Sequence, residues 1–121
     1  MSKSMILLAA TALCIVCGLP SCVTPVSTLY SWDNYDSAVY TYYKKQTPKS
    51  LEQVTKMYQE ITTSPKGTRQ VPPPGACAEY GYLLCLQGKK AEGMPLLEKE
   101  IELYPESKKF VERIISTINK D

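Results

Sequence analysis

The chain has 121 residues and a net charge of +2, from 14 Lys and Arg against 12 Asp and Glu, so its length suits one domain. A net charge this close to zero gives no electrostatic reason to expect nucleic-acid binding. The sequence contains no histidine, which removes the commonest general base, metal ligand and partner of a Ser or Cys nucleophile. We therefore expect a non-enzymatic protein without a metal or another cofactor.

Residues 1–21 have the three parts of a secretory signal peptide. Lys3 gives a positive start, residues 5–19 are almost entirely apolar, and the small residue Ser21 precedes a cysteine. The apolar run is shorter than the ~20 residues of a comfortable membrane span. An uncleaved N-terminal hydrophobic helix is the alternative. A metal site at the cysteines of this leader would lack a second ligand pair.

The sequence LPSC, which ends at Cys22, resembles a bacterial lipobox. Cleavage would leave Cys22 as the N-terminus with a diacylglyceryl group and an N-acyl chain such as palmitate, and two or more chains anchor a protein stably. Residues 22–28 form a predicted tether and residues 29–121 the domain. Val23, by resemblance to enterobacterial sorting, favours the outer membrane. We therefore expect a lipid-anchored protein of the bacterial cell envelope that faces the periplasm.

The domain begins with two helical patterns. The first places aromatic and apolar residues on one face from Trp32 to Tyr43. Thr47 is a predicted N-cap, followed by Pro48 at the first position of the second helix. The second pattern continues at helical spacing to Ile61.

Residues 69–75, RQVPPPG, favour a stiff extended connector, because three consecutive prolines lack N–H donors. Helices are predicted at residues 76–87 and 91–104, and an amphipathic helix from Phe110 to Ile118. Within the fourth pattern, Pro95 requires either a late start, just before it, or a kink in the first turn. About five helices and no alternating stretch predict an all-α domain of antiparallel helix hairpins.

Residues 74–107 resemble one helix-turn-helix repeat of the tetratricopeptide kind, whose period is about 34 residues. Gly81, Gly88 and Pro105 occupy the positions of its small residue, its turn glycine and its terminal proline. The small residue lets the second helix approach closely. Glu100 stands where the repeat has a small residue, so we expect it to pair with a basic or tyrosine side chain of a neighbouring helix. An ordinary α-helical bundle is the alternative.

Three further motifs lie along the chain: LYSW at residues 29–32, VPPPG at residues 71–75 and YPES at residues 104–107. Together they resemble a family of small bacterial lipoproteins of unknown function. The resemblance implies a periplasm-facing envelope lipoprotein. Genes of this family are often found beside two other genes. One encodes a lipoprotein that resembles the curli secretion channel, and the other encodes a second small lipoprotein. A three-part envelope assembly would follow.

Aromatic residues concentrate in the first helix and its lead-in, and those predicted to bind a partner are Tyr30, Trp32, Tyr35 and Tyr40. Exposed Tyr and Trp are enriched at protein interfaces. The alternative is that all of them pack in the core. The predicted function is a scaffold for protein–protein interaction, and the expected partners are other envelope proteins, namely lipoproteins. A peptidoglycan-binding or structural envelope lipoprotein is the alternative.

Cys77 and Cys85 fall on one predicted helix. A rise of ~1.5 Å per residue separates them by roughly 12 Å, beyond the ~7 Å that a disulfide tolerates. We expect both thiols to be small, buried core residues. An intermolecular disulfide and a thiol enzyme are the alternatives.

Overall fold

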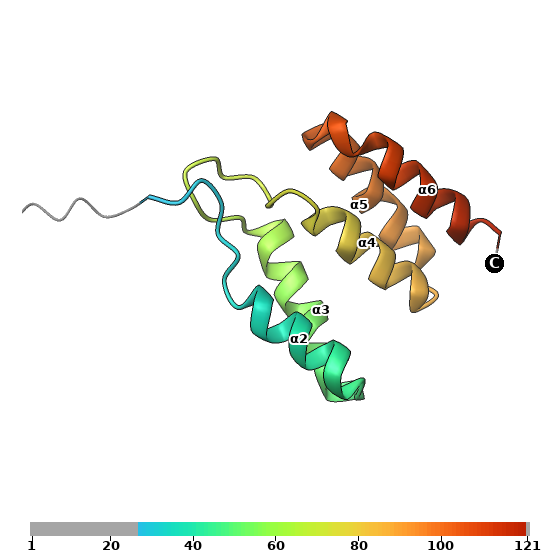
Figure 1. The fold of residues 1–121 in the computed structure, drawn as a ribbon, viewed down its shortest axis with the longest axis horizontal. Helices are drawn as coiled ribbons and strands as arrows, with labels where there is room; N and C mark the ends of the chain where they lie inside the picture. Colours follow the sequence, from blue (N-terminus) through green and yellow to red (C-terminus); the bar gives the residue numbers. More distant parts are fainter. Residues whose placement is uncertain (1–26, 121) are drawn as a thin grey trace, which may run out of the picture.

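The computed structural model describes residues 27–120, in which all regular structure is helical (Figure 1). These residues form α2 (Tyr35–Lys45), α3 (Pro48–Thr63), α4 (Ala76–Leu86), α5 (Lys90–Leu103), the short 3₁₀ helix η1 (Pro105–Ser107) and α6 (Lys108–Ile118). The all-α class and the number of helices are therefore confirmed. The predicted signal peptide and the lipobox cysteine, Cys22, lie outside the described residues.

The helix α2 begins later than its apolar pattern. Trp32 lies in a turn before it, where the Trp32 carbonyl accepts a hydrogen bond of 2.9 Å from the Tyr35 N–H. Asp33 has a φ of +43°, and such a left-handed residue does not continue a right-handed helix. At the other end Tyr43 is 70% exposed. The predicted apolar face from Trp32 to Tyr43 is therefore wrong at both ends.

The start of α3 is capped as predicted. Thr47 Oγ1 accepts a hydrogen bond from the Ser50 N–H at 3.2 Å, and Ser50 Oγ accepts one from the Thr47 N–H at 3.0 Å. These bonds satisfy two N–H groups that a helix start otherwise leaves without a partner. Pro48, at the first helical position, has no N–H to satisfy. The predicted N-cap and the proline after it are confirmed.

The helix α5 runs through Pro95 and begins at Lys90, so a late start just before the proline is wrong. Pro95 removes the hydrogen bond that residue 95 would donate to the carbonyl of Ala91. Both residues are exposed, so water can reach the freed carbonyl. The proline is tolerated because it lies on the solvent side of the helix.

The connection between α3 and α4 is fixed to the chain that enters the domain. Thr28 and Leu29 accept backbone hydrogen bonds from Thr68 at 3.0 Å and Arg69 at 3.1 Å. Gly67 has a φ of +95°, and a Cβ there would lie 2.7 Å from the Leu29 carbonyl oxygen. Only glycine lets the two segments approach so closely.

The same connection is fixed to α5. Tyr104, directly after α5, donates its hydroxyl to the Pro72 carbonyl at 2.7 Å. Glu100 Oε1 accepts the N–H of Gly75, the N-cap residue of α4, at 2.7 Å. Pro72 and Pro73 are buried. The proline segment is thus a non-helical connector, as predicted, and it is packed into the domain. It is not extended throughout, because Gln70 has a φ of +51° and the Pro73 carbonyl accepts the Ala76 N–H at 3.1 Å in a turn.

Two apolar clusters share α4. In the first, α2, α3 and α4 bury residues that include Val54 and Leu83. In the second, α4, α5 and α6 bury Ala78, Leu97 and Val111. Figure 1 shows α4 between the two sets of helices. A helix covered on two sides needs apolar residues nearly all round, as in its sequence ACAEYGYLLCL.

The hairpin of α4 and α5 is held at backbone contact. A Cβ on Gly81 would lie 2.7 Å from the Gly93 carbonyl oxygen and 3.0 Å from Leu97 Cγ. Gly88, with a φ of +79°, makes the turn between the helices. On the outer side, Phe110 is exposed, so its predicted place on the apolar face of α6 is wrong.

Candidate functional site

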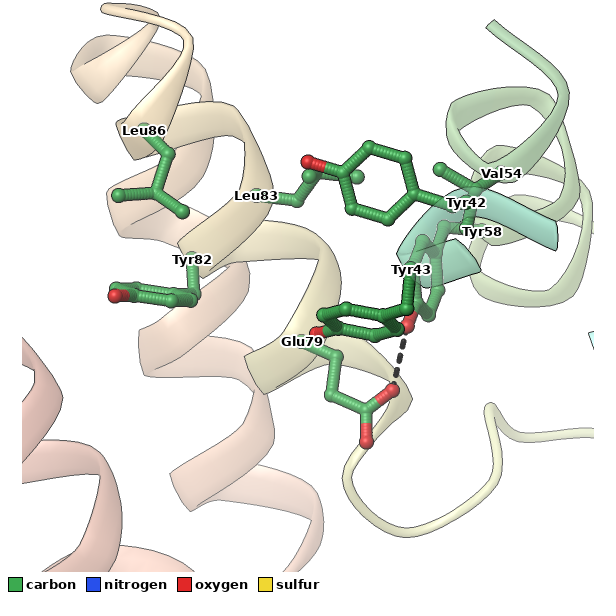
Figure 2. A pocket seen from close by; sticks show the side chains of 8 residues that line it. All are labelled: Tyr42, Tyr43, Val54, Tyr58, Glu79, Tyr82, Leu83 and Leu86. Atoms are coloured by element: carbon green, nitrogen blue, oxygen red, sulfur yellow. Dashed lines mark hydrogen bonds between the residues drawn. The ribbon is translucent and has the colours of Figure 1, made fainter. Parts of the chain in front are cut away.

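A cleft of about 210 Å³ lies between the α2–α3 hairpin and α4 (Figure 2). Each of the three helices supplies side chains, and tyrosines dominate. The lining residues are Tyr42, Tyr43, Val54, Tyr58, Glu79, Tyr82, Leu83 and Leu86. Ligand pockets for small molecules usually measure ~300–1,000 Å³, so this cleft is better matched to a few side chains of another protein.

The cleft exists because the helices diverge. The helix α2 packs on α3 and α3 packs on α4, but α2 and α4 do not pack on each other. Figure 1 shows α3 and α4 close together where the connector joins them and separating toward their other ends. Large aromatic side chains bridge the space that results. Leu83 and Val54 are buried at its base, whereas Tyr43, Tyr82 and Leu86 are 70%, 38% and 63% exposed.

Glu79 is the polar centre of this site. Its Oε2 accepts the hydroxyl of Tyr58 at 2.6 Å and the hydroxyl of Tyr35 at 2.7 Å. The two tyrosine rings meet edge to face with centroids 6.0 Å apart, a favoured geometry for aromatic pairs. Tyr58 also stacks on Tyr80 at 5.9 Å. One carboxylate thus holds tyrosines from α2 and α3 against α4.

Both hydroxyls are held in the protonated form. Burial is the main cause that raises the pKa of Tyr35 to about 12, and the hydrogen bond to Glu79 and its negative charge add to the rise. The same causes, burial first, raise the pKa of Tyr58 further. A tyrosinate beside a carboxylate would place two negative charges together. Both tyrosines are therefore hydrogen-bond donors throughout the neutral range.

None of the predicted partner-binding residues is among those that line the cleft. Trp32 contacts Tyr35 edge to face at 4.9 Å, and Tyr35 reaches the site through Glu79. Tyr40 is 64% exposed, with Lys44 Nζ 5.4 Å from its ring centroid.

Tyr30 lies at a different place. Its ring meets that of Tyr104 at 6.4 Å, and its hydroxyl accepts a hydrogen bond from Arg69 Nη1. The guanidinium also lies over the Tyr30 ring at 5.5 Å. These contacts give Tyr30 a role in fixing the entering chain to the connector and to α5.

Several residues of the cleft were not singled out from the sequence. They are Tyr58, Glu79, Tyr82 and Leu86. The cleft residues of α4 could have been predicted from the sequence. Residues 79, 82, 83 and 86 follow helical spacing, which places a carboxylate beside aromatic and apolar groups on one face. Tyr58 carries no such signal, since the pairing of α3 with α4 brings it to Glu79.

Glu100 has a different partner from the one predicted. It is fully buried, and Oε1 accepts a backbone N–H at the start of α4, so the expected pairing with a basic or tyrosine side chain is wrong. No described group donates to Oε2. A carboxylate is favoured at a helix N-terminus because the helix dipole is positive there.

The repeat-defining residues take the places that the spacing gives them. Gly81 lies buried between α4 and α5, Gly88 forms their turn, and Pro105 begins η1 directly after α5. Gly93, on α5, lies opposite Gly81.

The thiols of Cys77 and Cys85 are free. Cys77 is buried as predicted, whereas Cys85 is only half-buried, so its predicted burial is wrong. Burial raises the pKa of Cys77 to about 11, although Lys99 opposes the rise, and burial also raises the pKa of Cys85. A thiol acts as a nucleophile in its thiolate form. Because the pKa of each thiol is raised, little thiolate is present at neutral pH.

The described part of the chain contains neither a group of metal-ligating side chains nor a helix that could span a membrane. No three His, Cys, Asp or Glu side chains in residues 27–120 are grouped as metal ligands would be. None of the described helices is long and apolar enough to cross a membrane.

Comparison with known proteins identifies a family for this chain. A family model described as a domain of unknown function, DUF4810, matches residues 29–114. No curated protein and no solved structure gives a significant match. The matched segment runs from the lead-in of α2 into α6 and therefore includes the cleft.

Proposed function

The chain belongs to the DUF4810 family, whose function is unknown, and we propose that it is a lipid-anchored envelope protein that binds another envelope protein through its helical domain. The observation that carries the proposal is the tyrosine-lined cleft. Its rim leaves Tyr43, Tyr82 and Leu86 exposed together. Aromatic residues at the edge of a concave surface are typical of protein interfaces.

The proposed anchor is Cys22, the cysteine of the lipobox. Between Cys22 and Thr28, where backbone bonds to the connector begin, the chain can span at most about 20 Å. The domain would therefore stay close to the bilayer, with the connector end toward it. Val23 after the cysteine supports the outer membrane, and the predicted signal peptide of residues 1–21 supports the periplasmic side.

The proposed role is not catalytic. The sequence has no histidine, and burial of Cys77 and half-burial of Cys85 keep both thiols protonated. In the cleft the one carboxylate already accepts two tyrosine hydroxyls. These groups suit recognition better than bond breaking.

The partner to test first is another envelope lipoprotein. The resemblance of the LYSW, VPPPG and YPES motifs to lipoproteins encoded beside a curli-secretion-channel-like lipoprotein supports this choice. Such a partner would share the membrane surface with this chain. Two proteins confined to one surface meet at a high effective concentration, so a modest cleft can suffice for stable association.

Co-purification from detergent-solubilised membranes tests the proposal. The wild-type chain should bring down a reproducible partner, and Tyr82→Ala in the cleft should lose it. Phe110→Ala is the control, because Phe110 is also an exposed aromatic residue, 62% exposed against 38% for Tyr82, but lies on α6, outside the cleft. Equal recovery with both variants, or a wild type that purifies alone, contradicts the proposal. Retention by purified sacculi would favour the peptidoglycan-binding alternative.

Lipidation is tested separately. Cys22→Ser should abolish incorporation of labelled palmitate and release the chain from membranes. Cys85→Ser, which changes a half-buried thiol of the domain, should do neither. Unchanged labelling in Cys22→Ser would exclude this cysteine as the anchor.

A further inference from the structure

The cleft is lined by one charged side chain, Glu79, which has no ion-pair partner among the described residues. Glu79 is the only charged residue among those that line it. Its Oε2 accepts two tyrosine hydroxyls, while no described group donates a hydrogen bond to Oε1. The ion pairs of residues 27–120 join Lys66 to Asp33 and Lys108 to Glu112, so none of them involves Glu79. The carboxylate is held in place and keeps one oxygen free.

The surroundings of this carboxylate favour a cation. The Tyr43 and Tyr82 rings, from α2 and α4, lie at the edges of the cleft with much of their surface exposed (Figure 2). The face of a tyrosine ring attracts an ammonium or guanidinium group electrostatically. Leu86 beside them offers an apolar contact for an alkyl stem, and Lys and Arg bury such stems readily.

We propose that the cleft binds a lysine or arginine side chain of the partner protein, with the cationic group on Glu79 Oε1 and the stem against Tyr43 and Tyr82. The inference rests on the proposed function and adds the chemistry of the partner. The volume of about 210 Å³ suits the insertion of a side chain. An acidic side chain would meet Glu79 as a like charge. An apolar one would bury the free carboxylate oxygen without a hydrogen bond, at a cost in free energy.

The test compares two peptides that differ only in charge. The probe is Gly-Ala-Arg-Ala-Gly, acetylated and amidated, and its control carries citrulline, the neutral isostere of arginine. Binding to the full chain in phospholipid nanodiscs is followed by NMR shifts of backbone amides. We expect the arginine peptide to bind about tenfold more tightly, the factor that ~1.4 kcal/mol provides, with shifts centred on α2 and α4.

Two variants assign the effect to the carboxylate. Glu79→Gln keeps the shape of the side chain and an oxygen that accepts the tyrosine hydroxyls. In this variant the arginine and citrulline peptides should bind with about equal affinity. Glu98→Gln removes the same charge from an exposed site on α5, and it should keep the preference. Circular dichroism and the thermal midpoint establish that each variant is folded. If Glu79→Gln unfolds, Tyr82→Phe and Tyr82→Ala replace it, since only the second should weaken arginine binding.

The outcomes separate this inference from the proposed function. Equal binding of the two peptides, no binding of either, or shifts centred away from α2 and α4 overturns the inference. So does an arginine preference that persists in Glu79→Gln. A partner that co-purifies while the peptides are not distinguished leaves the scaffold role intact. A charge-dependent peptide site without any co-purifying partner supports the cleft chemistry and counts against the scaffold.

Discussion

The two sides of α4 are built in opposite ways. Toward α5, Gly81 and Gly93 bring the two backbones into contact, and a buried carboxylate fixes the start of α4. Toward α2 and α3, tyrosines and Glu79 span a wider separation and leave a cleft of about 210 Å³. Backbone contact leaves no surface for a partner, whereas bridging by large polar side chains does. Stability should therefore depend mainly on the first side and recognition on the second.

The largest loss of stability should come from Glu100→Ala. It removes a fully buried side chain and leaves the Gly75 N–H without its acceptor. A cavity together with a lost hydrogen bond to a charged group should cost about 3 kcal/mol. Urea denaturation measures it, with Glu98→Ala as the exposed control on the same helix. Equal midpoints for the two variants would mean that the carboxylate does not hold α4.

The contact between the two backbones is tested by Gly81→Ala. Alanine favours a helix over glycine by up to ~1 kcal/mol, but here its Cβ would lie 2.7 Å from the Gly93 carbonyl oxygen. Overpacking should dominate, with a net loss of about 2 kcal/mol. Gly88→Ala is the reference: its Cβ has nothing within 4 Å, and only the φ of +79° penalises it. That variant should lose about 1 kcal/mol. The reverse order would refute the close approach of α4 and α5.

On the other side of α4 the expected effects are smaller. Tyr58→Phe removes the hydroxyl that Glu79 accepts at 2.6 Å. Glu79 is exposed, so water can replace the lost donor and the cost should be about 1 kcal/mol. Tyr82→Phe serves as the control, because no described hydrogen bond involves its hydroxyl, and it should change stability by less than ~0.5 kcal/mol. A loss with Tyr58→Phe as large as that with Glu100→Ala would remove the distinction between the two sides.

The sequence predicted the two sides unequally well, for a physical reason. Glycine spacing, a turn glycine and a terminating proline are local rules, so the α4–α5 hairpin could be read from Gly81, Gly88 and Pro105. The cleft depends on the packing of α3 against α4, which brings Tyr58 to Glu79 from 21 positions away. Local spacing carries no information about such a contact. The sequence therefore predicted Trp32 and Tyr35 as binding residues, and these lie beside the cleft and do not line it.

The position of Glu100 shows the same limit. Its burial could be predicted because the repeat requires a packed residue there. Its acceptance of a backbone N–H could not, since that bond depends on where the connector of residues 71–75 crosses the end of α5. The side chain that departs most from the repeat thus fixes the start of the repeat's own first helix, α4.

The effect expressed furthest from neutral pH is the dependence of stability on alkaline pH. The folded-state pKa of Tyr35 is raised from 10.0 to about 12, so the unfolded chain loses this proton first as the pH rises. The stabilisation linked to Tyr35 is complete below pH 10.0 and is lost as the pH approaches about 12. Ultraviolet absorbance of tyrosinate follows the titration, and Tyr35→Phe identifies its share.

The titration of Tyr35 in Glu79→Gln tests whether the Glu79 carboxylate joins the tyrosines of α2 and α3 to α4. It removes the negative charge that helps raise the pKa of Tyr35, while burial, the larger cause, remains. The pKa should therefore fall part of the way from about 12 toward 10.0. Glu92→Gln, on the exposed side of α5, should leave the titration of Tyr35 in place. If both variants shift it equally, the effect is one of net charge, and Glu79 would not be the group that joins the tyrosines of α2 and α3 to α4.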